Sequence, residues 1–182
     1  MDPELERDII CRVKNGDQNR FAELVDRYKN PVFALVFRLT GNRDDAEDLA
    51  QEAFVKAFVS LRWFNPDRRF FPWLYTIALN LARNHLKQKR LVRFDSLTAV
   101  ADIDASSGDN PEHALQRLEQ AEQLRRALMQ LPLPLREAVS LRFLDELTFD
   151  DIAAILGVSQ SAAKMRVYRG LEKLSELMNS RE

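Results

Sequence analysis

Apolar residues recur at three- and four-residue spacings along most of the chain, and this is the period of amphipathic helices. In the first half, the spacing predicts helices over 5–14, 18–29, 31–39, 45–61 and 72–90. In the second half, it predicts helices over 112–129, 135–144, 149–156 and 160–178, with Pro132 and Pro134 interrupting the pattern. The predicted fold class is therefore all-α, and no sheet is needed.

A change of composition divides these helices into two groups. Segment 94–111 is poor in large apolar residues and rich in Ser, Asp and Ala, which is typical of a flexible linker. Asn110 followed by Pro111 then marks a new helix start. We therefore expect two small helical bundles, an N-terminal domain over 1–93 and a C-terminal domain over 112–182, joined by an acidic linker over 94–111.

The segment 148–170 has the pattern of a helix-turn-helix. Thr148 and Asp151 have capping-box spacing, Gly157 stands where a left-handed residue ends a helix, and Ser159 can cap the next one. The exposed side of the second helix is basic, with Lys164, Arg166, Arg169 and Lys173. In such motifs the second helix enters the major groove of DNA. For this segment alone, an ordinary helical hairpin with solvated cations is the alternative.

The predicted helix 45–61 has two distinct faces. At 100° per residue, one half of the cylinder is apolar, with Leu49, Ala50, Ala53, Phe54, Ala57, Phe58 and Leu61. The opposite stripe combines Asp48 and Glu52 with Val55 and Val59. Two exposed valines beside two carboxylates favour a docking surface for a basic, partly apolar partner. A solvated helix face is the alternative.

The predicted helix 72–90 carries a polar and basic stripe behind an aromatic loop. The stripe consists of Thr76, Asn80, Arg83, Lys87 and Arg90. The loop over 62–71 places Trp63, Phe64, Phe70 and Phe71 among three arginines. Aromatic rings beside cations suit single-stranded DNA, because unpaired bases stack on rings while phosphates attract Lys and Arg. Packing of most of these rings in the core is the alternative.

Charge and composition narrow the functional classes. The net charge is −1, but 80–93 contains five Lys or Arg and no acid, whereas 95–112 contains five acids and no Lys or Arg. This segregation indicates a local nucleic-acid surface beside an acidic connector. No membrane span or secretion signal is present, so we expect a cytoplasmic protein without membrane insertion. With Cys11 as the sole cysteine and two histidines, no disulfide, metal site or cofactor is predicted.

Four motifs together resemble the extracytoplasmic-function group of bacterial RNA polymerase sigma factors. GDQNRFAELVDRY resembles the start of the first conserved domain, and DAEDLAQEAFVKAF the segment that docks on polymerase. FPWLYTIALNLARNHLKQKR resembles the segment that melts the promoter and recognises the minus-ten element. LPLPLREAVSLRFLDELTFDDIAAILGVSQSAAKMRVYRGLEKL resembles the domain that recognises the minus-thirty-five element. All four occur in the family order and cover nearly the whole chain.

The resemblance implies a role for each matched position. Contacts to the polymerase clamp fall on Asp48, Gln51, Glu52, Val55 and Val59. Contacts to the minus-ten element fall on Phe64, Phe70, Trp73, Thr76, Asn80, Arg83, Asn84, Lys87 and Arg90, with an extruded base received by the loop before Trp73. Contacts to the minus-thirty-five duplex fall on Ser159, Ser161, Ala162, Lys164, Met165, Arg166, Tyr168 and Arg169. One departure is that Ser161, Ala162 and Ala163 replace the usual Gly-Thr-Val.

The expected function is that of an alternative sigma factor, a dissociable subunit that performs no covalent chemistry. Its implied partners are core RNA polymerase, promoter DNA and a cognate anti-sigma factor, which in this family is often membrane-tethered. The alternatives are a stand-alone helix-turn-helix regulator and a helical adaptor that binds only protein. An enzyme is the least favoured class, because no motif combines a nucleophile, a base and an orienting group.

Overall fold

The computed structural model describes residues 3–92, 111–143 and 147–179, and the regular structure in these ranges is helical throughout. The N-terminal part contains α1 (Pro3–Lys14), α2 (Phe21–Thr40), α3 (Arg43–Ser60) and α4 (Phe70–Val92), with short 3₁₀ turns at Gln18–Arg20 and Leu61–Trp63. The C-terminal part contains α5 (Pro111–Gln130), α6 (Leu133–Arg142), α7 (Phe149–Leu156) and α8 (Gln160–Asn179). The all-α prediction is confirmed for these residues. Nearly all of the predicted linker, 94–110, lies outside the described residues.

Helix α2 differs from the prediction of two helices separated near Pro31, because it runs through this proline as a single element. An interior proline costs a helix about 3 kcal/mol. The buried stripe of α2 continues across that position, with Leu24, Tyr28, Val32, Leu35, Val36 and Leu39. Each fully buried side chain of this kind contributes about 1.5–3 kcal/mol. Burial therefore outweighs the local cost of the proline, and the predicted break at this point was wrong.

The helix-turn-helix forms as the capping pattern predicts. Thr148 Oγ1 accepts from the backbone N–H of Asp151, and the Asp151 carboxylate accepts from the backbone N–H of Thr148. Gly157 ends α7 with φ of 68°, in the left-handed region that favours glycine. Ser159 Oγ accepts from the backbone N–H of Ala162 at 3.2 Å and so caps α8. These local bonds set where α7 begins and ends and where α8 begins.

Helices α6 and α8 cross closely at Gly170. A Cβ atom at this position would lie 2.4 Å from a methyl carbon of Val139 and 3.2 Å from the carbonyl oxygen of Leu135. Only glycine permits this approach without displacing α6. Helix α8, the second helix of the helix-turn-helix, therefore packs directly against α6.

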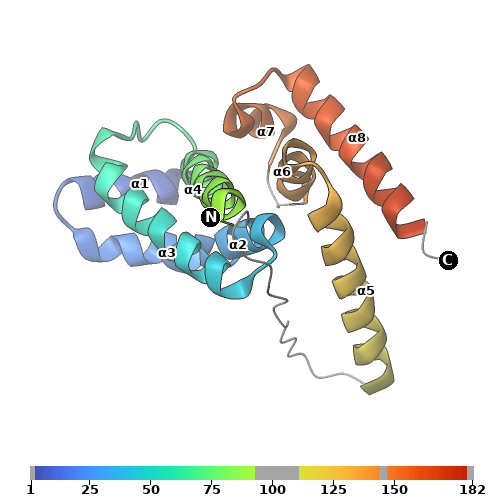
Figure 1. Cartoon of the computed structure of the whole chain (residues 1–182). Coiled ribbons are helices and arrows are strands. Elements are labelled where there is room, and N and C mark those ends of the chain that lie inside the picture. Colours follow the sequence, from blue (N-terminus) through green and yellow to red (C-terminus); the bar gives the residue numbers. More distant parts are fainter. Residues whose placement is uncertain (1–2, 93–110, 144–146, 180–182) are drawn as a thin grey trace.

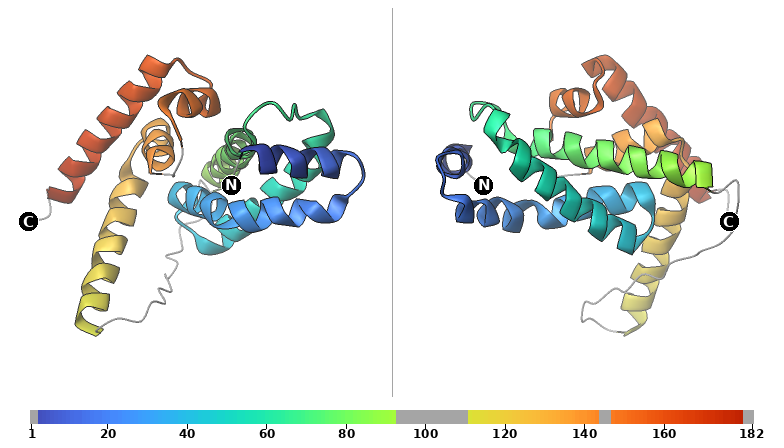
Figure 2. Two further views of the ribbon diagram at one scale, coloured as in Figure 1. Left: turned by 180° about the vertical axis from the view of Figure 1, so that it is seen from behind. Right: turned by 60° about the vertical axis from the view of Figure 1, so that its left-hand side comes forward.

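The N-terminal and C-terminal bundles pack against each other. Figures 1 and 2 show α6 and α7 beside α2 and α4, with α5 extending away along the outside. One apolar core continues from the N-terminal bundle into Ala138, Leu141, Ile152 and Ile155 of the C-terminal bundle. Helix α6 is buried over residues 136–141 because it lies between this shared core and α8. The described residues thus form a closed, two-part arrangement.

Candidate nucleic-acid interface

Helix α8 presents most of the predicted duplex-contacting residues on its outer side. Six of them are exposed, namely Ser159, Ser161, Lys164, Met165, Tyr168 and Arg169, and Ala162 and Arg166 are half-buried. On the opposite side, Ala163 and Val167 are buried. Within the described ranges, Arg166 and Arg169 form no ion pair. The helix therefore offers two uncommitted guanidinium groups to a polyanion.

Phe149, which the sequence interpretation missed, organises part of this surface. The Lys164 ammonium lies 5.6 Å from the Phe149 ring centroid, and the Tyr168 ring centroid lies 6.5 Å from it. A cation over an aromatic face is attracted to the ring quadrupole, so this contact restrains the lysine. The available sequence signal was an aromatic residue directly after the N-cap Thr148.

On α4, the predicted minus-ten stripe is only partly accessible. Asn80, Asn84, Lys87 and Arg90 are exposed, as the helical periodicity predicts. Thr76 is half-buried, and its hydroxyl donates to the carbonyl oxygen of Pro72 at 2.9 Å.

Arg83, in the middle of that stripe, is held by the C-terminal bundle. Its Nε and Nη2 atoms donate to the two carboxylate oxygens of Glu137 at 2.6 and 2.8 Å. Glu137 is only 3% exposed. The hydrogen bonds to Glu137 hold the pKa of Arg83 above its ordinary value, against the opposing effect of burial. A planar guanidinium paired with both oxygens of a carboxylate is a strong and directional contact.

Two of the aromatic residues predicted to contact DNA are core residues. Phe64 is 5% exposed and Phe70 is fully buried, and their rings meet edge to face at 5.8 Å between centroids. Both rings therefore pack in the core, the alternative that the sequence pattern left open, and Phe64 also lines the cavity beside the loop. Trp63 is instead the outward ring, at 69% exposure, with the Arg62 guanidinium 3.6 Å from its centroid.

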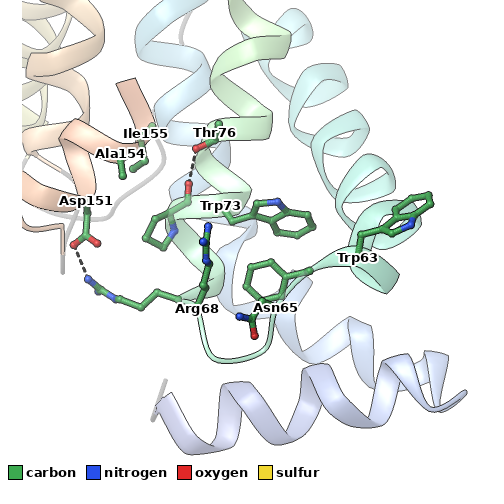
Figure 3. A pocket seen from close by; sticks show the side chains of 11 residues that line it. Trp63, Asn65, Arg68, Trp73, Thr76, Asp151, Ala154 and Ile155 are labelled. Carbon is green, nitrogen blue, oxygen red and sulfur yellow. Dashed lines mark hydrogen bonds and ion pairs between the residues drawn. The ribbon is translucent and has the colours of Figure 1, made fainter. Parts of the chain in front are cut away.

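A cavity of about 560 Å³ lies between the aromatic loop and α7 (Figure 3). The N-terminal bundle contributes one wall, which includes Trp63, Asn65, Arg68, Trp73 and Thr76. The other wall is formed by Asp151, Ala154 and Ile155 of α7. The Asp151 carboxylate lies 2.5 Å from Nη1 of Arg69 in the aromatic loop. A second arginine of the N-terminal bundle is thus paired with an acid of the C-terminal bundle.

Backbone carbonyl groups at helix ends add two further contacts between the bundles. Arg136 donates to the carbonyl oxygens of Leu39, Met129 and Leu131 at 2.8, 2.5 and 3.0 Å. Arg125 donates to the carbonyl oxygen of Gly41 at 3.2 Å. Carbonyl groups at helix C-termini lack intrahelical donors and carry partial negative charge, so they are good acceptors for arginine. Burial lowers the pKa of Arg136.

The predicted polymerase-docking residues remain uncovered. Asp48, Gln51, Glu52, Val55 and Val59 are all exposed on α3, whereas Ala46, Leu49, Ala50, Ala53, Phe54 and Ala57 of the same helix are buried. This confirms the two-faced pattern of the helix. Glu52 makes a surface ion pair with Lys56 at 2.9 Å. We call the exposed stripe Asp48, Gln51, Glu52, Val55 and Val59 the α3 face.

Other chemistry is sparse in the described ranges. No group of three His, Cys, Asp or Glu side chains is placed to hold a metal ion there. Cys11 is a half-buried free thiol. His85 is half-buried, with Nε2 3.2 Å from the carboxylate of Asp45. Among the helices described in the structure, none is long and apolar enough to cross a membrane.

Comparisons with known proteins identify the two bundles. The family model for sigma-70 region 2 matches residues 24–92, and the model for sigma-70 region 4 matches residues 121–174. The chain is 36% identical to the ECF RNA polymerase sigma factor SigW of Bacillus subtilis over 173 residues, which are 91% of this chain and 92% of that protein. It is also 36% identical over 173 residues to the ECF RNA polymerase sigma-E factor of Escherichia coli K12, with 91% and 90% coverage.

Two solved structures match both bundles in a single superposition. CnrH in complex with the cytosolic domain of CnrY gives a TM-score of 0.72 at 29% identity, covering 97% of this chain and 99% of that chain. The sigma factor RpoE of Bartonella quintana in complex with the anti-sigma factor NepR gives 0.73 at 25% identity, covering 89% and 98%. The chain belongs to the extracytoplasmic-function group of RNA polymerase sigma factors.

Proposed function

We propose that this sigma factor binds core polymerase through the α3 face, the minus-ten element through α4 and the aromatic loop, and the minus-thirty-five duplex through α8. The proposal is supported by the family and by the outward position of most residues in these sets. The chain acts in the cytoplasm and performs no covalent step, since the polymerase supplies the catalysis. Its own contribution is to position and open the promoter.

We further propose that the arrangement in the structure is a closed form that cannot hold an open promoter. The single observation that carries this proposal is the pairing of Arg83 with Glu137, supported by the pairing of Arg69 with Asp151. A carboxylate offers the same bidentate acceptor geometry as a phosphate. Both acids therefore occupy guanidinium groups that a DNA backbone along α4 would require.

The position of α7 leads to the same conclusion. Its residues Asp151, Ala154 and Ile155 form one side of the cavity beside the aromatic loop (Figure 3). A DNA strand lying along α4 and entering this loop would meet α7. The two bundles must therefore separate before the promoter is opened.

The α3 face, by contrast, is accessible in the closed form. Its two acids and two valines are exposed on the N-terminal bundle. Core polymerase can therefore bind first, and separation of the bundles then follows on the enzyme. In this order, Arg69, Arg83 and the cavity beside the aromatic loop stay engaged by the C-terminal bundle until the catalytic partner is present.

An anti-sigma factor is the expected negative regulator. The solved RpoE relative is in complex with the anti-sigma factor NepR, and its superposition on this chain includes both bundles. An anti-sigma factor that binds the closed form of this chain and not the open form would stabilise closure in proportion to that difference in affinity. Regulation would then act by shifting the equilibrium between the closed and open forms of the chain.

Runoff transcription tests the central proposal. We expect the chain to direct core polymerase depleted of sigma factors to initiate at a subset of promoters in a genomic library, and to give no transcript without core enzyme. A protein that footprints duplex DNA tightly alone but never supports initiation would instead be a stand-alone helix-turn-helix regulator. A protein whose partners do not include polymerase would be an adaptor.

Alanine at Arg166 or Arg169 is expected to weaken holoenzyme binding to the minus-thirty-five duplex. Each phosphate contact that is lost should reduce the slope of log affinity against log salt by about one. The measurement is a salt titration of holoenzyme binding to a promoter fragment. Lys173→Ala, one turn beyond Arg169 on α8, is the matched control; an unchanged slope for both arginine variants would remove them from the interface.

A further inference from the structure

We propose that α1 is a positioning element for the promoter-opening loop, which we define as residues 61–70. The inference rests on the proposed function, in which this loop holds the separated strands. Helix α1 lies outside the region that the sigma-70 region 2 model matches, which begins at residue 24. Three polar side chains of α1 nevertheless reach the loop, one at each end and one between them.

Glu6 fixes the junction between the loop and α4. Glu6 is 8% exposed, and its carboxylate accepts from the backbone N–H of Phe70 at 3.1 Å and from the hydroxyl of Tyr28. Phe70 is the first residue of α4. The first amide groups of a helix have no intrahelical acceptor and carry partial positive charge, so a buried carboxylate there both satisfies a donor and stabilises the helix start.

Lys14 fixes the other end of the loop. Its ammonium donates to the carbonyl oxygen of Phe64 at 2.7 Å, in a partly buried contact between residues 50 positions apart. Between the two ends, Arg7 pairs with Asp67 at 2.8 Å. Both of these side chains are largely exposed, so this pair contributes little by itself. The two anchoring contacts are therefore those of Glu6 and Lys14.

Helix α1 can hold the loop because its other side is embedded in the bundle. Ile9, Ile10 and Val13 are buried in the shared core. The local bonds of the loop lie within its own turns: the amides of Phe64 and Arg68 donate to the carbonyl oxygens of Leu61 and Asn65, and the amide of Asp67 donates to the Asn65 side chain. A rigid helix thus adds a restraint from outside the loop. Because the cavity residues Asn65 and Arg68 belong to this loop, their placement depends on α1.

Intrinsic fluorescence gives a test of positioning that needs no partner. The chain has two tryptophans, Trp63 and Trp73, and both line the cavity beside the loop. Lys14→Met and Glu6→Gln are expected to increase acrylamide quenching of these tryptophans while helical content stays the same. Lys29→Met is the matched control, because Lys29 pairs only with Asp26 on its own helix. Equal quenching in Lys14→Met and Lys29→Met would overturn the proposal.

Promoter opening by the full holoenzyme gives the functional test. Permanganate reactivity of unpaired thymines should fall about 3- to 10-fold for Lys14→Met, the range that the net contribution of a typical intramolecular hydrogen bond supports. Core polymerase affinity should change less than about twofold. A parallel loss of core affinity and opening would mean that α1 merely supports the bundle, and would overturn the proposal.

The two measurements separate this inference from the proposed function. If the unmodified chain fails to open any promoter, the proposed function is wrong, and the quenching experiment still judges whether α1 orders the loop. If quenching changes in Lys14→Met but opening by an active holoenzyme does not, the inference that α1 positions a promoter-opening loop is wrong.

Discussion

Glu137→Lys is expected to raise the affinity of the free protein for promoter DNA with an unpaired minus-ten region by about tenfold or more at low salt. The substitution removes the acid that pairs with Arg83 and places a like charge beside it, so the closed form is destabilised. Apparent affinity is reduced by the fraction of molecules in the competent form, so a tenfold gain corresponds to a tenfold larger open fraction. Fluorescence anisotropy with a labelled promoter fragment measures the change.

A charge-matched control is needed, because any added cation increases attraction to DNA. Glu47→Lys makes the same charge change on the exposed surface of α3, away from Arg83. Small-angle X-ray scattering should show a larger radius of gyration for Glu137→Lys and not for Glu47→Lys. If the two variants gain affinity equally and neither expands, the Arg83–Glu137 pair does not control closure.

Reversing both acids of the α3 face, as Asp48→Lys with Glu52→Lys, is expected to lower core polymerase affinity by at least about tenfold. The reason is electrostatic: a docking surface that combines acids with exposed valines suits a basic, partly apolar partner, and like charges at such an interface cost several kcal/mol. Both side chains are exposed, so the bundle should keep its helical content and thermal stability. Size-exclusion chromatography or a pull-down with purified core enzyme measures the loss.

The control for this reversal is the pair Glu23→Lys with Asp26→Lys. These acids are exposed on α2 and make only local ion pairs. The net change in charge is identical, so any difference between the two double variants reports the position of the charge. Full retention of core binding in Asp48→Lys with Glu52→Lys would remove the α3 face from the polymerase interface.

Features set by local physics could be predicted from the sequence. The capping box of Thr148 and Asp151 and the left-handed Gly157 depend on residues within a few positions, and all three are present as expected. The two faces of α3 follow from the helical period alone and are also confirmed. The predicted helix break at Pro31 is wrong, because the long buried stripe of α2 opposes the local penalty of the proline.

Features that depend on packing between distant segments could not be predicted. Arg83 and Glu137 are 54 residues apart, and nothing in the spacing of either helix indicates that they meet. The exposed side of α4 was inferred correctly at Asn80 and Lys87, but the helical period cannot show that another bundle covers Arg83. In the aromatic loop, apolar rings among arginines are compatible with both core and surface positions, so the sequence does not show that Phe64 and Phe70 are buried.

The buried position of α6 has a mechanical consequence. Neighbouring residues on this one helix face in different directions: Arg136 and Glu137 contact the N-terminal bundle, while Leu135 and Val139 lie against Gly170 of α8. Because the contact with Gly170 of α8 and the ion pair with Arg83 of α4 belong to one rigid helix, breaking the Arg83–Glu137 pair leaves α6 and α8 packed together. In the proposed opening, the helix-turn-helix therefore moves away without refolding. The change between the closed and open forms can for that reason be fast.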